Sequence, residues 1–253
     1  MAPFKNAMEV FKLLVKSNCR KCEMPTCLAF AAAVFQGRKP LSDCPHLDAD
    51  IIARLGEPLP AEPTAGELEA QKALEELKQK AAAVDLAAAA KRLGGEYAHG
   101  KLTLKILGKN FSMDQQGNLY SDIHIHEWVA VPFLNYITEG VGKDPTGRWV
   151  PLRELPSGQD WYRLFEQRSE KPLKRVADIY TDLFEDMAHL FAGRQVDKHY
   201  DADISLVLHP PPKVPMLICY WKPEDGIESS LHLFFDETAE ENLPIGAIYA
   251  LGA

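Results

Sequence analysis

Four of the five cysteines in this 253-residue chain fall within one short segment near the N-terminus. They follow the pattern Cys19-x2-Cys22-x4-Cys27-x16-Cys44, and Pro45 comes directly after the last of them. Thiolates are soft ligands, and four of them can close a tetrahedral zinc site or hold the irons of a 4Fe–4S cube. The spacing favours the cube, because bacterial ferredoxin cluster motifs also end in a cysteine followed by proline.

Two other interpretations of these cysteines stay open. Zinc sites with four cysteines usually consist of two Cys-x2-Cys pairs, and only the Cys19–Cys22 half has that form. The other interpretation is a set of reduced structural thiols. Disulfide bonds are not expected, because residues 1–16 contain no signal-peptide core and no apolar run approaches the roughly 20 residues that span a membrane. The chain is therefore expected to stay in the cytoplasm.

Charge is distributed unevenly along the chain. The net charge is −8, but residues 1–56 contain eight Lys or Arg against five Asp or Glu, which gives +3 there and leaves −11 for the remainder. An acidic body argues against nucleic acid as a partner. Near the cysteines, Lys16, Arg20 and Lys21 could offset the negative charge of a thiolate-bound cluster, and they fit equally well as ordinary solvated charges.

Composition separates a small N-terminal domain from the rest of the chain. Residues 1–56 form the expected cluster-binding domain, which is mostly helical, with helices predicted at residues 7–16 and 26–36. The second of these helices is almost entirely apolar and is expected to back the cluster with a dry wall. Residues 57–66 contain three prolines and predict an extended linker.

The chain is predicted to belong to the α+β class, and its larger domain, residues 67–253, to contain an antiparallel sheet. The reason is that strands and helices are grouped along this domain rather than alternating. It begins with a long helix predicted over residues 67–93, which two glycines end. Short apolar runs predict strands at residues 102–107, 111–113, 119–126, 204–208, 214–221 and 230–235. Helical periodicity predicts further helices at residues 128–137 and 173–191.

His124 and His126 form a second candidate metal site. They lie on one face of a predicted strand and need a third imidazole to hold a metal ion. The candidates for that third ligand are His99, His189 and His199. The alternative is a half-exposed strand that leads into a helix. The fifth cysteine, Cys219, lies in an apolar strand and is predicted to be a buried, unreactive thiol.

The cysteine segment resembles a known 4Fe–4S module. The matching residues are Asn-Cys-Arg-Lys-Cys-Glu-Met-Pro-Thr-Cys-Leu-Ala-Phe-Ala at 18–31 and Asp-Cys-Pro at 43–45. They are similar to the N-terminal domain of the large subunit of the corrinoid iron–sulfur protein and to the cluster segment in the B subunit of Rnf-type electron-transport complexes. The resemblance covers about a fifth of the chain. It implies that one low-potential cluster is bound by Cys19, Cys22, Cys27 and Cys44.

Two positions depart from the pattern of that module. Where it usually has glycine after the first and second cysteines, this chain has Arg20 and Glu23. Glycine would allow a positive φ and a close approach of the backbone to the cluster sulfides. The larger residues lead us to expect a slightly different loop and a shifted reduction potential, with every ligand retained.

The larger domain resembles an uncharacterised domain of anaerobic bacteria and archaea that often follows this cluster segment. The matching residues are Trp128–Tyr136, Gly147–Trp149, Leu152–Gly158, Pro212–Leu217, Phe234–Asp236 and Leu243–Pro244. That family carries no assigned reaction, so the resemblance implies a relationship and not a mechanism.

Together these features predict an electron-transfer protein rather than a stand-alone enzyme. Its cluster would pass single electrons at low potential to a redox partner protein, and the resemblance implies a corrinoid protein as one acceptor in anaerobic metabolism. A second hypothesis is a redox enzyme with another cofactor in the larger domain, although no motif for one occurs. A third is a binding or scaffold module that a zinc ion staples together.

Overall fold

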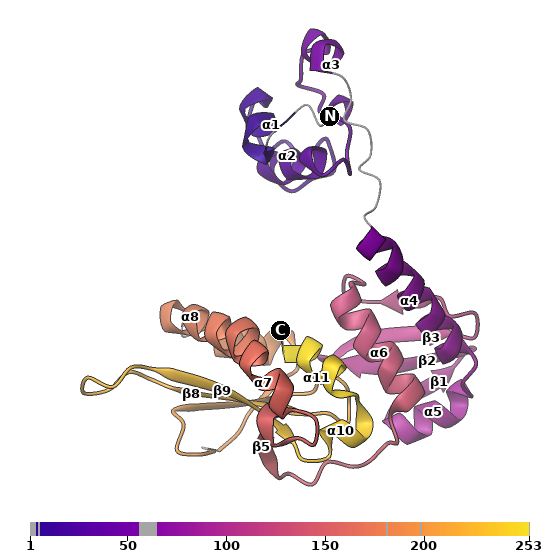
Figure 1. Ribbon diagram of the computed structural model, residues 1–253, viewed down its shortest axis with the longest axis vertical. Coiled ribbons are helices and arrows are strands. Elements are labelled where there is room, and N and C mark those ends of the chain that lie inside the picture. Colours follow the sequence, from indigo (N-terminus) through magenta and orange to yellow (C-terminus); the bar gives the residue numbers. More distant parts are fainter. Residues whose placement is uncertain (1–3, 5, 56–64, 181, 198, 253) are drawn as a thin grey trace. The chain divides into compact units, whose positions relative to one another are not determined.

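The computed structural model describes residues 4, 6–55, 65–180, 182–197 and 199–252. It forms two compact units, Met1–Ala70 and Gln71–Ala253 (Figure 1). Most of the predicted linker, residues 57–64, lies outside the described residues, and the last two linker positions begin helix α4 (Ala65–Ala82). None of the described helices is both long and apolar enough to cross a membrane.

The N-terminal unit is mostly helical, as its sequence predicts. It contains helices α1 (Ala7–Leu13), α2 (Cys27–Phe35) and α3 (Ala49–Leu55) and a single 3-10 turn, η1 (Leu41–Asp43). Its small core consists of apolar side chains from these elements, each at most 1% exposed: Val10, Phe30, Ala31, Val34 and Leu41. The apolar α2 therefore serves as the centre of this unit.

Local capping decides where α2 begins and ends. The Thr26 hydroxyl accepts a hydrogen bond from the Ala29 N–H at 3.0 Å, which satisfies one of the free donors of the first turn. At the other end Gly37 adopts φ +68°, and the N–H groups of Gly37 and Arg38 bond back to Val34 and Ala33. This is a Schellman motif, in which glycine adopts the left-handed conformation without steric cost.

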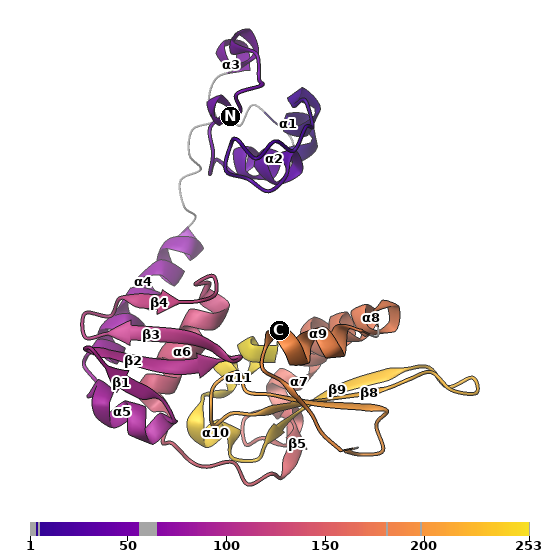
Figure 2. The same ribbon diagram turned by 180° about the vertical axis from the view of Figure 1, so that it is seen from behind.

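The first half of the larger unit is an antiparallel sheet covered by helices on one face (Figures 1 and 2). The strands lie in the order β1 (Glu96–Ala98), β2 (Lys101–Ile106), β3 (Lys109–Asp114) and β4 (Leu119–Ser121). Helices α5 (Leu86–Leu93) and α6 (Glu127–Glu139) pack on it. The Phe111 and Phe133 rings, 4.5 Å apart between centroids, join β3 to α6.

The predicted single helix over 67–93 is wrong, because the chain breaks between α4 and α5. Asp85 has an extended backbone, and its carboxylate accepts hydrogen bonds from the N–H groups of Ala87 and Ala88, each at 3.0 Å. An aspartate in this position starts a new helix. The predicted end is confirmed: Gly94 adopts φ +77° after Leu93.

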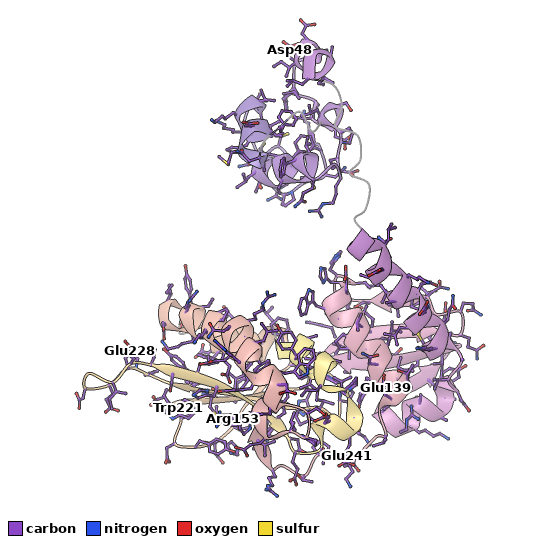
Figure 3. The ribbon with its side chains drawn as sticks, in the orientation of Figure 1. Asp48, Glu139, Arg153, Trp221, Glu228 and Glu241 are labelled. Carbon is purple, nitrogen blue, oxygen red and sulfur yellow. The ribbon has the colours of Figure 1, made fainter. Side chains whose placement is uncertain are left out.

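The second half of the larger unit is a separate antiparallel sheet. Its strands lie in the order β5 (Trp149–Pro151), β9 (Ser230–Asp236), β8 (Met216–Trp221), β7 (Ile204–Leu208) and β6 (Arg194–Gln195). Figure 3 places Trp221 and Glu228 on the hairpin between β8 and β9. Its tip is an Asp-Gly turn with φ +45° and +86°, the two positive values that a tight type I′ turn needs. The predicted α+β class is therefore confirmed, with two sheets.

Helices cover one face of this second sheet. They are α7 (Gln159–Phe165), α8 (Lys171–Ile179), α9 (Leu183–Leu190), α10 (Ala239–Asn242) and α11 (Ile245–Gly252), with a 3-10 turn, η2 (Leu152–Glu154). A π-turn, η3 (Glu166–Glu170), joins α7 directly to α8. The shared core contains Phe165, Ile218, Leu233 and Phe235, each at most 1% exposed.

Two predicted elements of the larger domain are shorter than expected. The helix predicted over 173–191 is interrupted, because Tyr180 leaves the helical conformation (φ −127°, ψ 84°) and is 66% exposed. Val176 and Leu190, whose spacing contributed to the helical periodicity of that segment, are 43% and 57% exposed. The strand predicted over 119–126 ends at Ser121, so the residues before α6 form a loop.

Candidate metal centre

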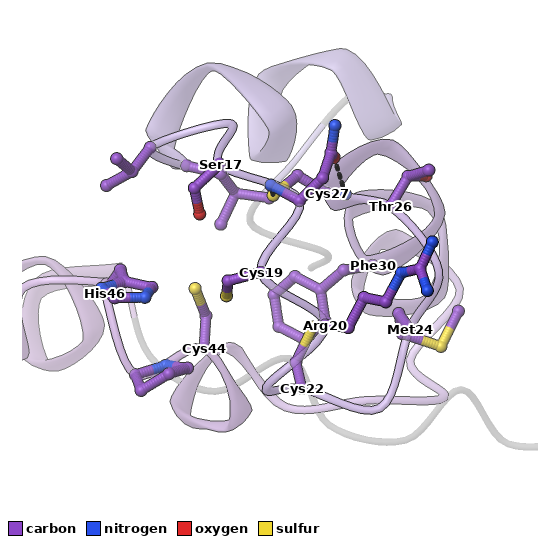
Figure 4. A pocket seen from close by; sticks show the side chains of 14 residues that line it. Ser17, Cys19, Arg20, Cys22, Met24, Thr26, Cys27, Phe30, Cys44 and His46 are labelled. Carbon is purple, nitrogen blue, oxygen red and sulfur yellow. Dashed lines mark hydrogen bonds between the residues drawn. The ribbon is translucent and has the colours of Figure 1, made fainter.

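The structure gathers Cys19, Cys22, Cys27 and Cys44 around one pocket of the N-terminal unit (Figure 4). Cys19 and Cys22 lie on the loop between α1 and α2, Cys27 is the first residue of α2, and Cys44 follows η1. Cys22 and Cys44 are each only 9% exposed, Cys27 is partly buried and Cys19 is exposed. The cavity between these side chains is small, about 10 Å³.

The wall of this pocket is apolar on the side of α2. Phe30, one turn along the helix from Cys27, is 1% exposed and lines the pocket together with Leu14 and Met24. Figure 4 shows the Phe30 ring close to the Cys19 and Cys22 side chains. A water-poor wall of this kind is one of the features by which a protein controls the reduction potential of a bound cluster.

The ligand loop has an unusual backbone. Lys16, Asn18, Arg20 and Glu23 adopt φ values of +60°, +49°, +61° and +61°, in the left-handed region that larger residues rarely occupy. Left-handed residues that alternate with ordinary ones turn successive N–H groups to one side and form anion-binding concavities, which occur at many iron–sulfur sites. At Arg20 and Glu23, the positions expected to change the loop, the backbone keeps the conformation that glycine adopts most easily.

Asn18 closes this loop onto α2. Its side-chain oxygen accepts a hydrogen bond from the Cys27 N–H at 2.8 Å, and its own N–H donates to the Cys27 Sγ at 3.3 Å. The second bond supplies a donor to a thiolate, which stabilises negative charge on sulfur. Sequence reasoning did not assign a role to Asn18. The available signal was an asparagine, a residue that tolerates positive φ, directly before the first cysteine.

The three basic residues near the cysteines, Lys16, Arg20 and Lys21, make different contacts. The Lys16 ammonium lies 5.3 Å from the centre of the Phe11 ring, in a cation–π contact. Arg20 lines the pocket beside the cysteines (Figure 4). The backbone N–H of Lys21 and, after it, the Ser17 hydroxyl lower the pKa of the Cys19 thiol, which makes the thiolate, the form that metals bind, easier to reach.

We expect Arg20→Gly to stabilise the N-terminal unit relative to Arg20→Ala by about 1 kcal/mol, because a left-handed backbone strains every residue with a Cβ. At Lys21, whose φ is not positive, the order should reverse, with Lys21→Ala more stable than Lys21→Gly by about 0.5–1 kcal/mol. Hydrogen exchange of the α2 amides measures both differences. If the Ala variant were the more stable one at position 20, as it is expected to be at position 21, the left-handed geometry of Arg20 would be contradicted.

The second candidate metal site gains no third ligand from the residues that the structure describes. His124 and His126 lie on the loop before α6, with ring centroids 6.3 Å apart. His126 instead caps α6, since its Nδ1 accepts a hydrogen bond from the Trp128 N–H at 3.3 Å. Among the described residues, no three His, Cys, Asp or Glu side chains are grouped tightly enough to hold a single metal ion.

The fifth cysteine lies in the larger unit. Cys219, on β8, is fully buried beside the Ser205 hydroxyl, and burial raises the pKa of its thiol to about 11. A thiol held in the neutral form is a poor nucleophile and a poor metal ligand. The prediction that Cys219 is a buried thiol is confirmed.

Comparison with known proteins finds two separate family matches along the chain. Residues 14–46, which include all four clustered cysteines, match a family model described as "Putative Fe-S cluster". Residues 85–253 match the model of a domain of unknown function, DUF3786. Because that model covers more than half of the sequence, the chain belongs to the DUF3786 family.

The curated relatives share only the cysteine segment. The gamma subunit of the acetyl-CoA decarbonylase/synthase complex from Methanothermobacter thermautotrophicus is 43% identical over 49 residues, which are 19% of this chain and 11% of that protein. The large subunit of the corrinoid/iron–sulfur protein from Moorella thermoacetica is 45% identical over 40 residues, 16% of this chain and 9% of that protein. No solved structure matches the chain. The predicted resemblance at the N-terminus is thereby confirmed.

Proposed function

We propose that this protein binds one 4Fe–4S cluster through Cys19, Cys22, Cys27 and Cys44 and transfers single electrons at low potential. The observation that carries the proposal is the convergence of four thiols on one pocket, bordered by a loop with left-handed residues at four positions. The donor set suits the cluster, because iron in such cubes is held by cysteine thiolates. We assign this role to a cluster domain of residues 1–56, joined by the linker 57–66 to the DUF3786 domain within residues 67–253.

The arrangement supports a cube over a zinc ion. Four thiolates that share one zinc ion each lie about 2.3 Å from it, so their sulfurs must lie close together. Within the part of the chain that the structure describes, no three of these cysteines are grouped tightly enough to share one metal ion. A cube supplies one iron to each thiolate and leaves its sulfides to the N–H groups of the surrounding loop.

An electron carrier needs a partner. The matched relatives carry names of corrinoid and acetyl-CoA decarbonylase/synthase subunits, although the match spans only about a tenth of their length. We infer a redox partner protein in anaerobic metabolism, with a corrinoid protein as the first candidate. The five cysteines are free thiols, which suits a reducing compartment such as the cytoplasm.

Purification without oxygen, followed by metal analysis and spectroscopy, tests the proposal. We expect about four iron and four sulfide per chain, with a broad absorption band near roughly 400 nm that bleaches with dithionite and an EPR signal in the reduced state. A colourless protein with one zinc ion per chain would overturn the proposal and favour a zinc-stapled binding module.

A further inference from the structure

The π-turn between α7 and α8 places two polar residues inside the larger unit. Turns of this type insert one extra residue into a helix and frequently occur at functional sites. In η3, Ser169 and Glu170 are each only 3% exposed, whereas the neighbouring Gln167 and Arg168 are exposed. Burial of a hydroxyl and a carboxylate is unfavourable unless each has a partner.

Glu170 is partnered at one of its two carboxylate oxygens. Its Oε1 accepts a hydrogen bond from the Leu233 N–H of β9 at 2.9 Å, whereas its Oε2, 3.5 Å from Nδ1 of His232, is buried without a hydrogen-bond partner. The buried hydroxyl of Ser169 also has no hydrogen-bond partner in the structure. Buried hydroxyls are nearly always paired, so an unpaired one calls for an explanation.

Ser169 lines a cavity of about 370 Å³ between α8, α9 and the second sheet. The cavity is lined mainly by apolar side chains, among them Leu173, Met187, Phe191, Leu208, Ile218 and Leu233. Its size lies within the range of small-molecule sites, which are mostly apolar with a few polar groups that fix the ligand's orientation.

A cation borders the same cavity. Arg168 lines it and is exposed, and none of the ion pairs found among the described residues involves it. Two neighbouring lysines already form ion pairs: Lys171 lies 3.5 Å from Glu166, and Lys174 lies 2.8 Å from Asp178. The apolar cavity is thus bordered by Ser169, whose buried hydroxyl is unpaired, and by Arg168, which forms no ion pair with another described residue.

We propose that this cavity binds a small molecule with an apolar body and one carboxylate. The apolar body occupies the space beside Leu173, Met187 and Phe191, where it removes hydrocarbon surface from water. The carboxylate accepts hydrogen bonds from the Ser169 hydroxyl and the Arg168 guanidinium, a group that suits carboxylate recognition. This site lies outside the cysteine segment and does not depend on the cluster.

Calorimetric titration of the full chain, purified without oxygen, tests this site with decanoate and decan-1-ol, two probes with the same apolar chain. Decanoate should bind at least tenfold more tightly than the alcohol, because only the carboxylate engages Arg168. Ser169→Ala and Arg168→Gln should each weaken decanoate binding by about tenfold. Arg163→Gln, an exposed position of α7 outside the cavity, is the matched control and should bind decanoate as the parent does.

The unliganded variants supply a second measurement. Ser169→Ala should unfold at the same temperature as the parent or a higher one, because it removes a buried group without a partner. A purely structural serine would instead lose stability when replaced. Absence of decanoate binding, equal affinity for decanoate and decan-1-ol, or unchanged affinity in both Ser169→Ala and Arg168→Gln would overturn the proposal.

Discussion

Replacement of Cys27 with serine is expected to remove most of the bound iron and the visible absorption of the protein. A hydroxyl is a much poorer ligand for iron than a thiolate, and Cys27 lies at the first position of α2 with the Asn18 N–H on its sulfur. Cys219→Ala should keep the full iron content, because that thiol is buried in the second sheet. Iron, sulfide and absorbance per folded chain are the quantities to compare.

This pair of variants separates a specific ligand from a general effect of losing a thiol. Both remove one of five free cysteines, and both sites are at least partly buried. Equal iron loss in the two proteins would mean that the cysteine at position 27 is not a ligand. Full iron content in Cys27→Ser would lead to the same conclusion, and so would contradict the proposed donor set.

Replacement of Asp236 with alanine is expected to destabilise the larger unit by about 3 kcal/mol or more, because it leaves several buried N–H and O–H donors without an acceptor. Asp236 is fully buried at the end of β9. Its carboxylate accepts from the Gly147 N–H at 2.7 Å, from the Thr146 N–H at 3.2 Å, and from the Thr238 hydroxyl and N–H at 2.7 and 3.1 Å.

Glu237→Ala is the matched control for Asp236→Ala. The neighbouring Glu237 forms an exposed ion pair with Arg148 at 3.1 Å, so its replacement should change the free energy of unfolding by at most about 1 kcal/mol. All four tryptophans lie in the larger unit, and urea unfolding followed by tryptophan fluorescence therefore reports on that unit alone. Equal decreases in the free energy of unfolding of the two variants would show that the buried hydrogen bonds stabilise the unit no more than the exposed ion pair does.

The contribution of Asp236 should also depend on pH. Burial by itself would raise the pKa of this carboxyl, but the hydrogen bonds from Thr238, Thr146 and Gly147 outweigh it and hold the pKa below its usual value. A group whose pKa is lower in the folded state stabilises the protein above its unfolded pKa, near 3.9, and loses that effect as pH falls through the folded pKa. The difference in the free energy of unfolding between the parent and Asp236→Asn, a variant that does not ionise here, should therefore become smaller below about pH 4.

The parts of the structure that sequence predicted well are those encoded locally. The strand predicted at residues 204–208 has the same bounds in the structure, and Thr26 and Gly37 mark the limits of α2 by their side-chain and backbone chemistry. The break at Asp85 was also encoded locally, as a capping residue inside an otherwise helical segment, and was missed.

Other features depend on contacts between distant residues. The apolar period continues past Tyr180 without glycine or proline, so only the packing of α8 and α9 reveals the interruption. The cavity beside Ser169 needs α8, α9 and three strands, β7, β8 and β9, to be assembled before it exists. At the candidate metal centre, the cysteine spacing pointed to four side chains that line one pocket in the structure. The left-handed conformation of Arg20, in contrast, runs against the preference of the residue type.

The hydrogen bond from Leu233 to Glu170 has a consequence for how this protein meets other molecules. Strand β5 pairs with β9 only from Phe234 to Asp236, so Leu233 has no partner residue on β5. An unpaired backbone N–H at the edge of a sheet can bind a strand from another chain. Because Oε1 of Glu170 already accepts a hydrogen bond from this N–H, an incoming strand would have to displace a buried carboxyl group, which opposes pairing at this margin of the sheet.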